Sequence, residues 1–202
     1  MDTYEKVAML ESLRVVVDTR EQLTDKAMKR YQSFKCPFIR EKINYGDYTY
    51  TAKLPNGKWL HQLHAGCDGI NPPLSIERKM NLDELAGCFT HDRARFEREF
   101  ERAKANNGKI VLLVEDASWE NLLNGRYRSK FNSNAFSASV CAWAARYNLN
   151  LFFCKSETSG RIIHDLLYYD LKERIEKGFY DCRGDQKESF NAGDLKQDEH
   201  TN

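Results

Sequence analysis

Residues 74–83 of the chain read LSIERKMNLD, and this stretch decides the fold. Its first six residues have the short apolar start of a buried strand, and the segment from Leu82 onward reads as a helix. Residues two apart on a strand project from one face, so Glu77 and Lys79 are expected side by side and Arg78 on the opposite face. Burying a carboxylate beside an ammonium costs free energy, which indicates a purpose other than stability.

Strand-like and helix-like patterns alternate on both sides of this stretch. The expected strands cover residues 13–18, 39–43, 48–54, 58–63, 110–115 and 149–154, and the expected helices cover residues 22–34, 82–88, 93–106, 118–123, 134–147 and 156–177. Pro55, Asn56 and Gly57 form a strong turn signal inside residues 39–63, which therefore read as a meander. A β-rich beginning followed by alternating helices and strands predicts an α/β fold, with a central mixed β-sheet flanked by helices.

Composition excludes two broad classes of protein. The chain has 202 residues and a net charge of only +1, so it is not a grossly basic polyanion binder, and any nucleic-acid contact must come from local patches. No apolar run approaches the roughly 20 residues of a membrane span, and no signal-peptide pattern opens the chain. Six scattered cysteines read as reduced thiols. We expect an intracellular protein without a membrane partner, cytoplasmic if it is bacterial or phage-encoded and otherwise nuclear.

Charge is unevenly distributed along the chain. Residues 179–202 contain six acids against three basic residues, a net charge of −3, and very few apolar side chains. Such a segment buries too little surface to offset the entropy of ordering. We therefore expect one domain over residues 1–178 and a disordered acidic tail over residues 179–202.

Acidic residues fall where the predicted strands begin and end. Asp47 and Glu77 can hold a hard divalent cation through their oxygens, which would polarise a phosphate and acidify a bound water. Lys79 can orient or activate that water, or stabilise charge developing at phosphorus. This set is typical of phosphodiester hydrolysis. Taken alone, Gly46 and Asp47 would more often form an ordinary turn, so the interpretation depends on the joint pattern.

Three further acids accompany this set, and their roles stay open at this point. Asp18 and Glu21, in the segment VDTRE at residues 17–21, could be further metal ligands or partners of the ligands. Asp83, four residues after Lys79, could cap the following helix or lie behind the metal ligands.

Three motifs together resemble the ERCC4-type nuclease domain, the family of the XPF and archaeal Hef structure-selective endonucleases. They are VDTRE at residues 17–21, GDY at residues 46–48 and ERKMNLD at residues 77–83, in the order of the family signature GD, a gap, then ERKxxxD. Weaker matches extend to about residue 172. The resemblance implies a restriction-endonuclease-like core and DNA cleavage dependent on Mg²⁺ or Mn²⁺.

The resemblance also implies roles for individual residues. It places Asp47, Glu77 and Lys79 in the catalytic set, Asp18 and Glu21 as upstream acids, and Arg20, Arg78, Asp83 and Arg95 in supporting positions. The chain departs from the family in a longer stretch at residues 52–73, in Glu99 where the motif has Gln, and in the lack of a tandem helix-hairpin-helix. Alternative functions are another restriction-endonuclease-like enzyme, such as a junction resolvase, and a non-catalytic DNA-binding subunit.

The expected partners are DNA, preferably branched or flapped, and a second subunit. Residues 125–131 combine three cations with two aromatic residues, which suit phosphates and unpaired bases respectively. The residues expected to contact DNA are Arg93, Arg95, Arg126, Arg128 and Lys130. A homodimer or heterodimer is expected through the apolar faces of the predicted helices at residues 134–147 and 156–177.

Overall fold

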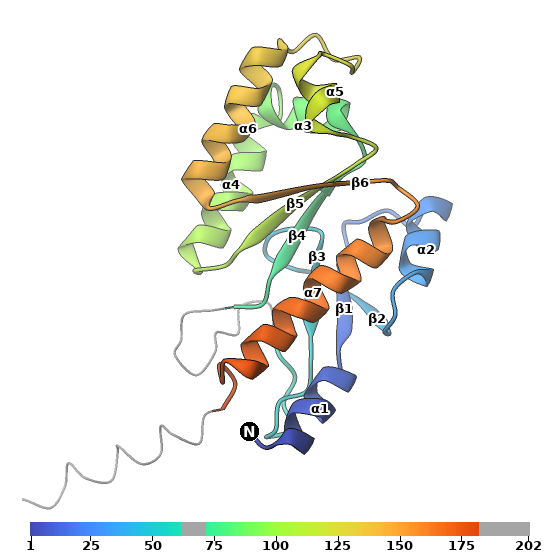
Figure 1. Cartoon of the computed structure of the whole chain (residues 1–202), viewed down its shortest axis with the longest axis vertical. Helices are drawn as coiled ribbons and strands as arrows, with labels where there is room; N and C mark the ends of the chain where they lie inside the picture. The colour runs from blue at the N-terminus through green and yellow to red at the C-terminus, as the bar shows by residue number, and fades with distance from the viewer. Residues whose placement is uncertain (62–71, 182–202) are drawn as a thin grey trace, which may run out of the picture.

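The computed structural model describes residues 1–61 and 72–181, which form one mixed sheet covered by helices (Figure 1). The strands are β1 (Arg14–Asp18), β2 (Phe38–Glu41), β3 (Tyr48–Thr51), β4 (Ser75–Lys79), β5 (Ile110–Glu115) and β6 (Asn150–Cys154), in the order β2-β1-β3-β4-β5-β6. β3 runs antiparallel to both neighbours, and the other neighbouring pairs are parallel. The predicted α/β fold with a central mixed sheet is confirmed.

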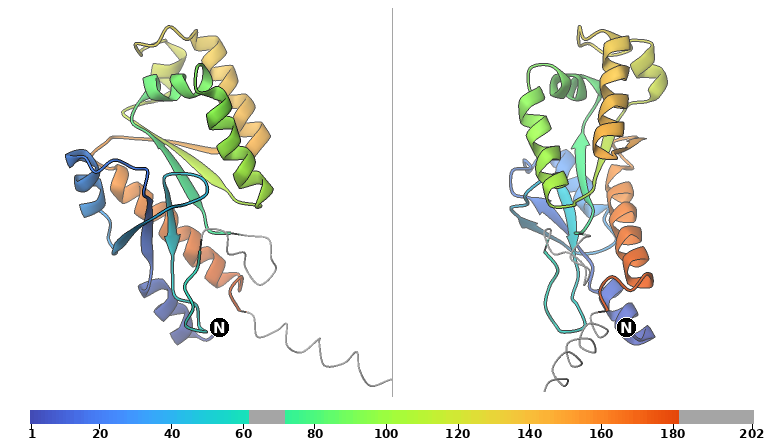
Figure 2. Two further views of the ribbon diagram at one scale, coloured as in Figure 1. Left: turned by 180° about the vertical axis from the view of Figure 1, so that it is seen from behind. Right: turned by 90° about the vertical axis from the view of Figure 1, so that its left-hand side faces the viewer.

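Helices cover both faces of the sheet (Figure 2). They are α1 (Thr3–Glu11), α2 (Asp25–Gln32), α3 (Leu82–Phe89), α4 (Arg93–Ala105), α5 (Trp119–Leu123), α6 (Ser133–Tyr147) and α7 (Ser159–Glu176). One apolar core joins α1, α2 and α7 to the sheet, and the other joins α3, α4 and α6 to its opposite face. The alternation of strand side chains divides them between the two cores, since Val111 and Leu113 enter the first while Leu112 and Val114 enter the second.

The N-terminal part of the fold differs from the prediction in three respects. Helix α1 was not predicted, although Asp2 and Glu5 form a capping box that marks its start. Helix α2 begins only after Thr24, which caps it, and Leu23 is exposed. The expected meander is wrong for β2, because this strand pairs in parallel with β1 at the outer edge of the sheet.

The turn at residues 55–57 forms as predicted, with the Gly57 amide donating to the Leu54 carbonyl oxygen at 2.8 Å. Gly57 has a φ of +83°, a value that favours glycine. After the turn, the described residues of the expected fourth strand form an isolated bridge between Lys53 and Trp59, and the Leu60 amide donates to the Ala52 carbonyl oxygen at 2.9 Å. The remainder of that strand and residues 62–71 of the longer stretch at residues 52–73 lie outside the described residues.

The two ends of the described chain lie together. Tyr180 is buried, with its hydroxyl 3.5 Å from that of Tyr50, and the Met1 amino group pairs with Asp181. The expected acidic tail falls outside the described residues from position 182 onward. Among the residues described, no helix is long and apolar enough to cross a lipid bilayer.

The apolar faces of α6 and α7 pack largely within the chain, and the subunit interface expected on these two helices stays a prediction. On α6 the buried side chains are Phe136, Val140 and Trp143, and on α7 they include Ile163, Leu167, Leu171 and Ile175. Tyr169 is the large apolar side chain of α7 that is exposed. The expected interface was inferred from helical spacing, and the same spacing describes a helix packed on its own sheet.

A buried ion-pair network ties the first core together. Arg30 of α2 lies 3.0 Å from the Glu115 carboxylate at the end of β5, and it also donates to the Ser159 and Tyr48 hydroxyl oxygens. Glu115 accepts a second bond from Arg78 of β4, at 3.2 Å. One guanidinium thus connects α2 to β5, α7 and β3. Gly160 allows the start of α7 to approach α2, because a Cβ there would collide with the α2 backbone.

Replacing Arg30 with Leu should lower the free energy of unfolding by about 3 kcal/mol, because the Glu115 carboxylate would lose a buried partner. Urea denaturation measures this change. Arg161→Leu is the matched control, since Arg161 forms an exposed pair with Asp165 on α7 and its loss should cost less than about 0.5 kcal/mol. Equal effects of the two substitutions would show that the buried pair does not hold α2 to the sheet.

Candidate active site

Strand β4 delivers Glu77 and Lys79 to the face covered by α3 and α4. Both side chains are buried, and the Lys79 ammonium donates to the Glu77 carboxylate with Nζ and Oε1 2.5 Å apart. The ammonium also lies over the ring of Phe96, 5.2 Å from its centroid. Arg78 points to the other face, where it meets Glu115. The prediction that Glu77 and Lys79 share one face of the strand and that Arg78 points to the other is therefore confirmed.

Asp47 is held against the same strand by its backbone and by its side chain. Its amide donates to the Ile76 carbonyl oxygen at 2.8 Å, and its carboxylate accepts from the Arg78 amide at 2.7 Å. Gly46 before it has a φ of +77°, and a Cβ at this position would lie 3.0 Å from the Ile76 carbonyl oxygen. A glycine is therefore needed at the turn that brings Asp47 beside Glu77.

The three buried groups interact strongly. Burial raises the pKa of Asp47 well above its usual range, and the neighbouring Glu77 carboxylate raises it further. Burial also raises the pKa of Glu77, although Lys79 acts in the opposite direction. Burial alone would lower the pKa of Lys79, but the Glu77 and Asp47 carboxylates outweigh it and the pKa rises. With both carboxylates beside it, Lys79 is held as an ammonium, whose charge suits electrostatic stabilisation.

The upstream acids are bonded to other groups. Asp18 accepts from Nε and Nη2 of Arg20 at 2.9 and 2.7 Å, and from the Ile43 amide at 3.2 Å. Burial works to raise the pKa of Asp18, but the hydrogen bonds from Arg20 and Ile43 hold it below its ordinary value. Glu21 accepts from the Tyr48 hydroxyl at 3.2 Å and lies 3.8 Å from Arg78. This geometry favours supporting roles for both acids over direct metal ligation.

The donor set fits a hard cation held by two carboxylates. Glu77 Oε2 is buried and has no hydrogen-bond partner within the described part of the chain, and the charge of Glu77 helps to raise the pKa of the buried Asp47 carboxyl. Across residues 1–61 and 72–181, no group of three or more His, Cys, Asp or Glu side chains could hold a metal ion. Mg²⁺ is often bound by only one or two carboxylates, with water and substrate phosphates completing its shell.

Asp83 has a different role from those expected. Asn81 caps α3, since its side chain accepts from the Glu84 amide at 2.9 Å. The Asp83 carboxylate instead accepts from the amides of Arg128 and Ser129 at 2.7 and 2.8 Å, and from Arg128 Nε at 3.1 Å. The last acid of the ERKxxxD motif therefore fastens the basic loop, defined as residues 125–131, to α3.

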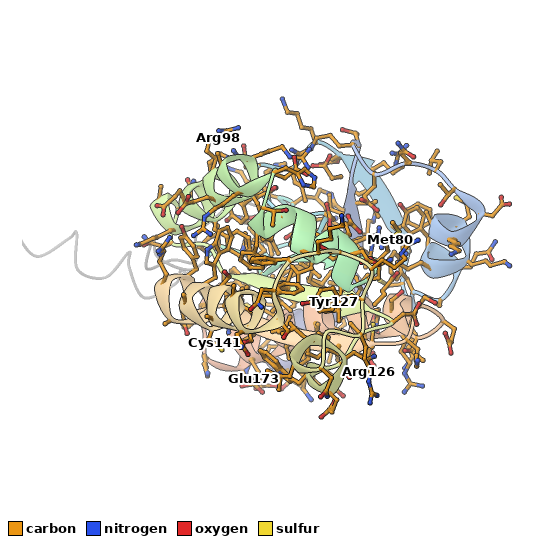
Figure 3. The ribbon with its side chains drawn as sticks, turned by 90° about the horizontal axis from the view of Figure 1, so that it is seen from above. Met80, Arg98, Arg126, Tyr127, Cys141 and Glu173 are labelled. Atoms are coloured by element: carbon orange, nitrogen blue, oxygen red, sulfur yellow. The ribbon has the colours of Figure 1, made fainter. Side chains whose placement is uncertain are left out.

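The cations of the basic loop are exposed, and its two aromatic rings are half-buried. Tyr127 and Phe131 pack on Phe136 of α6, at centroid distances of 5.5 and 5.2 Å, so part of each ring is covered by the protein. Arg126 is exposed at the edge of the molecule in the view from above (Figure 3). Lys130 is also exposed, and the Arg128 side chain is 88% exposed despite its bond to Asp83.

The start of α4 carries the other predicted DNA contacts. Arg93 and Arg95 are both exposed, and the Arg95 guanidinium lies 3.6 Å from the Asp92 carboxylate. These cations belong to the helix that packs against Lys79 through Phe96.

Glu99 lies at the site, whereas the sequence interpretation noted it only as a departure from the family motif and gave it no role. Its carboxylate accepts from the Gly46 amide at 3.0 Å, directly before Asp47, and it acts electrostatically on Glu77. A signal was present, because Glu99 lies three residues after Phe96 and one before Phe100, on the buried side of α4.

Comparison with known proteins agrees with these observations. The ERCC4 domain profile matches residues 17–166. The chain resembles the solved structure of XPF from Aeropyrum pernix with a TM-score of 0.50 and 17% identity, over 94% of this chain and 67% of that one. It resembles XPF from Aeropyrum pernix in complex with DNA with a TM-score of 0.53 and 19% identity, over 80% of this chain and 66% of that one.

Comparison with curated protein sequences gives no match. This chain spans about two thirds of the length of the two XPF chains, and identities this low establish the fold alone. That fold agrees with the restriction-endonuclease-like core that the sequence motifs imply. The profile covers most of the chain and includes the whole of the VDTRE, GDY and ERKMNLD motifs, so the chain belongs to the ERCC4 domain family.

Proposed function

We propose that this chain is a DNA endonuclease that hydrolyses phosphodiester bonds with Mg²⁺ or Mn²⁺. The observation that carries the proposal is the buried cluster of Asp47, Glu77 and Lys79, with one carboxylate oxygen of Glu77 left without a hydrogen bond in the described part of the chain. Burying charged groups of this kind costs folding free energy, so their presence in the core is better explained by a functional site than by stability. Membership of the ERCC4 domain family supports the same chemistry.

Each residue of the cluster has a role that its surroundings support. Asp47 and Glu77 would hold the cation, which when bound polarises a phosphate and lowers the pKa of a coordinated water. Lys79 keeps its proton, so its ammonium can stabilise the negative charge that develops on the phosphate oxygens. The Arg78 amide fixes the Asp47 carboxylate, and the Arg78 guanidinium fastens β4 to Glu115 behind the site.

We further propose that the exposed cations around the site bind DNA phosphates. Arg93 and Arg95 precede the part of α4 that packs on Lys79, and the basic loop contributes Arg126, Arg128 and Lys130. Contacts to phosphate do not read sequence, which is consistent with selection of flapped or branched DNA by shape. The XPF protein solved in complex with DNA has the same fold. Assembly as a homodimer or heterodimer stays a prediction.

Glu77→Gln should reduce DNA cleavage about 100-fold or more while leaving DNA affinity unchanged, because it removes ligand charge without touching the exposed cations. Cleavage of a flap substrate in Mg²⁺, Mn²⁺ and EDTA, with DNA binding measured in parallel, provides the test. Glu120→Gln, on the exposed face of α5, is the control and should cut normally. Undiminished cutting in EDTA would rule out the proposed chemistry.

Lys79→Met should leave Mn²⁺ binding intact and lower the cleavage rate about 100- to 1000-fold, because the ammonium acts on developing charge rather than on the cation. Titration calorimetry gives the Mn²⁺ affinity, and single-turnover cleavage gives the rate. Methionine keeps the contact with the Phe96 ring, and circular dichroism checks that the variant folds although Glu77 loses its buried partner. A variant that cleaves as fast as the unchanged protein would exclude Lys79 from the catalytic set.

Asp83→Ala should make the basic loop open more often, because two backbone amides and one guanidinium lose their acceptor. Trypsin cleavage after Arg126 and Lys130 should become about tenfold faster, which corresponds to the loss of one or two charge-assisted hydrogen bonds. Asp92→Ala removes a comparable partly exposed carboxylate near α3 and should change nothing. If both variants are cut at the same rate, Asp83 does not order this loop.

A further inference from the structure

Three consecutive residues of the loop that carries Asp47 contact either α4 or the segment directly after it. The Arg102 side chain donates from Nε to the Asn44 carbonyl oxygen at 2.9 Å. Tyr45 is fully buried beneath the end of α4, where Gly108 leaves it room, since a Cβ at position 108 would collide with the Tyr45 hydroxyl. The Gly46 amide donates to the Glu99 carboxylate at 3.0 Å. Two side chains of α4 and the close approach of Gly108 after it thus hold the residues directly before Asp47.

Helix α4 is a firm base for these contacts. Phe96 and Phe100 are buried in the second core, where both rings pack against Trp143 at centroid distances of 4.9 and 5.1 Å. Aromatic side chains packed in this way resist rotation and translation of the helix. The position of Glu99 between them is therefore fixed by the core rather than by solvent-exposed contacts.

The Gly46 turn needs such an anchor. Gly46 adopts a left-handed backbone conformation. Because glycine lacks a Cβ, its backbone is also the most flexible, and this freedom must be restricted if Asp47 is to stay beside Glu77. The Glu99 side chain is 16% exposed, and its carboxylate lies 3.8 Å from Arg102 and 4.0 Å from Arg20, so cations on two sides help to hold it in place. A charged acceptor for a backbone amide is stronger than a neutral one.

We propose that Glu99 is a positioning residue that fixes the Gly46 turn, so that the Asp47 and Glu77 carboxylates are placed together before a cation binds. The inference rests on the proposed function for its consequence on metal binding, but the hydrogen bond itself does not depend on it. Glu99 acts through Asp47 and is not itself a ligand, because one of its oxygens is committed to the Gly46 amide and no three-acid site occurs in the described residues. Positioning of ligands by such partners commonly changes metal affinity 10- to 100-fold.

The experiment compares Glu99→Ala and Glu99→Gln with Glu101→Ala. Glutamine keeps a side-chain oxygen for the Gly46 amide, whereas alanine removes it. Glu101 is exposed on the same helix and accepts from Tyr147, so its substitution removes an equal charge without touching the loop. The first measurement is hydrogen exchange of the Gly46 amide by NMR, and the second is Mn²⁺ affinity by titration calorimetry without DNA.

In Glu99→Ala, we expect the Gly46 amide to exchange at least about tenfold faster and Mn²⁺ to bind about tenfold more weakly. Glu99→Gln should show native-like exchange, and its Mn²⁺ affinity should change by only about threefold, because the loss of one screened charge is a small effect. Glu101→Ala should match the unchanged protein in both measurements. This rescue by glutamine distinguishes a hydrogen-bonding role from a purely electrostatic one.

Two outcomes would overturn the inference. Unchanged exchange of the Gly46 amide in Glu99→Ala would show that the bond does not hold the turn. Equal Mn²⁺ weakening in Glu99→Gln and Glu99→Ala would assign the effect to charge. If the unchanged protein does not bind Mn²⁺, the proposed function fails instead, and the exchange measurement still decides whether Glu99 holds the turn.

Discussion

The fold depends on a charged segment placed in a central strand. Strand β4 lies between β3 and β5, yet it carries Glu77, Arg78 and Lys79, so ionic groups enter both faces of the sheet. Charges in such a place are tolerated only when each has a partner. On one face the partners are Glu77 and Lys79 themselves with Asp47, and on the other face Glu115 accepts from Arg78. The helices then enclose these pairs rather than a purely apolar sheet.

Much of this arrangement could be predicted from local sequence, because strands and helices repeat with fixed periods. The period of two placed Glu77 beside Lys79, and the apolar run at residues 110–115 matches β5 residue for residue. Contacts between distant segments could not be predicted in this way. Asp83 meets Ser129 across 46 positions and Glu99 meets Gly46 across 53, so neither pair belongs to a local pattern. The parallel pairing of β2 with β1 could not be predicted for the same reason. Helix α1, by contrast, could have been predicted, because its capping box is a local signal.

The ERKxxxD motif joins two tasks within seven residues. Its first acid, Glu77, belongs to the buried cluster. Its last acid, Asp83, holds the basic loop, which follows α5. Helix α3 connects the two and begins at Leu82, so the distance between the strand end and the loop is set by a rigid element. DNA held by the loop would be placed relative to the cluster through this short helix. Asp83 would thus contribute to the site by holding the basic loop, although it lies outside the buried cluster.

Asp47 is attached to β4 by hydrogen bonds to Ile76 and Arg78, not by the chain that leads from β3 to β4. The number of residues in that connection therefore does not determine the position of Asp47 relative to Glu77. Added residues between the GDY and ERK motifs should therefore leave the relative position of the two carboxylates unchanged, whereas one residue added between Glu77 and Lys79 would turn them to opposite faces. The stretch at residues 52–73 can thus be long without displacing Asp47 from Glu77.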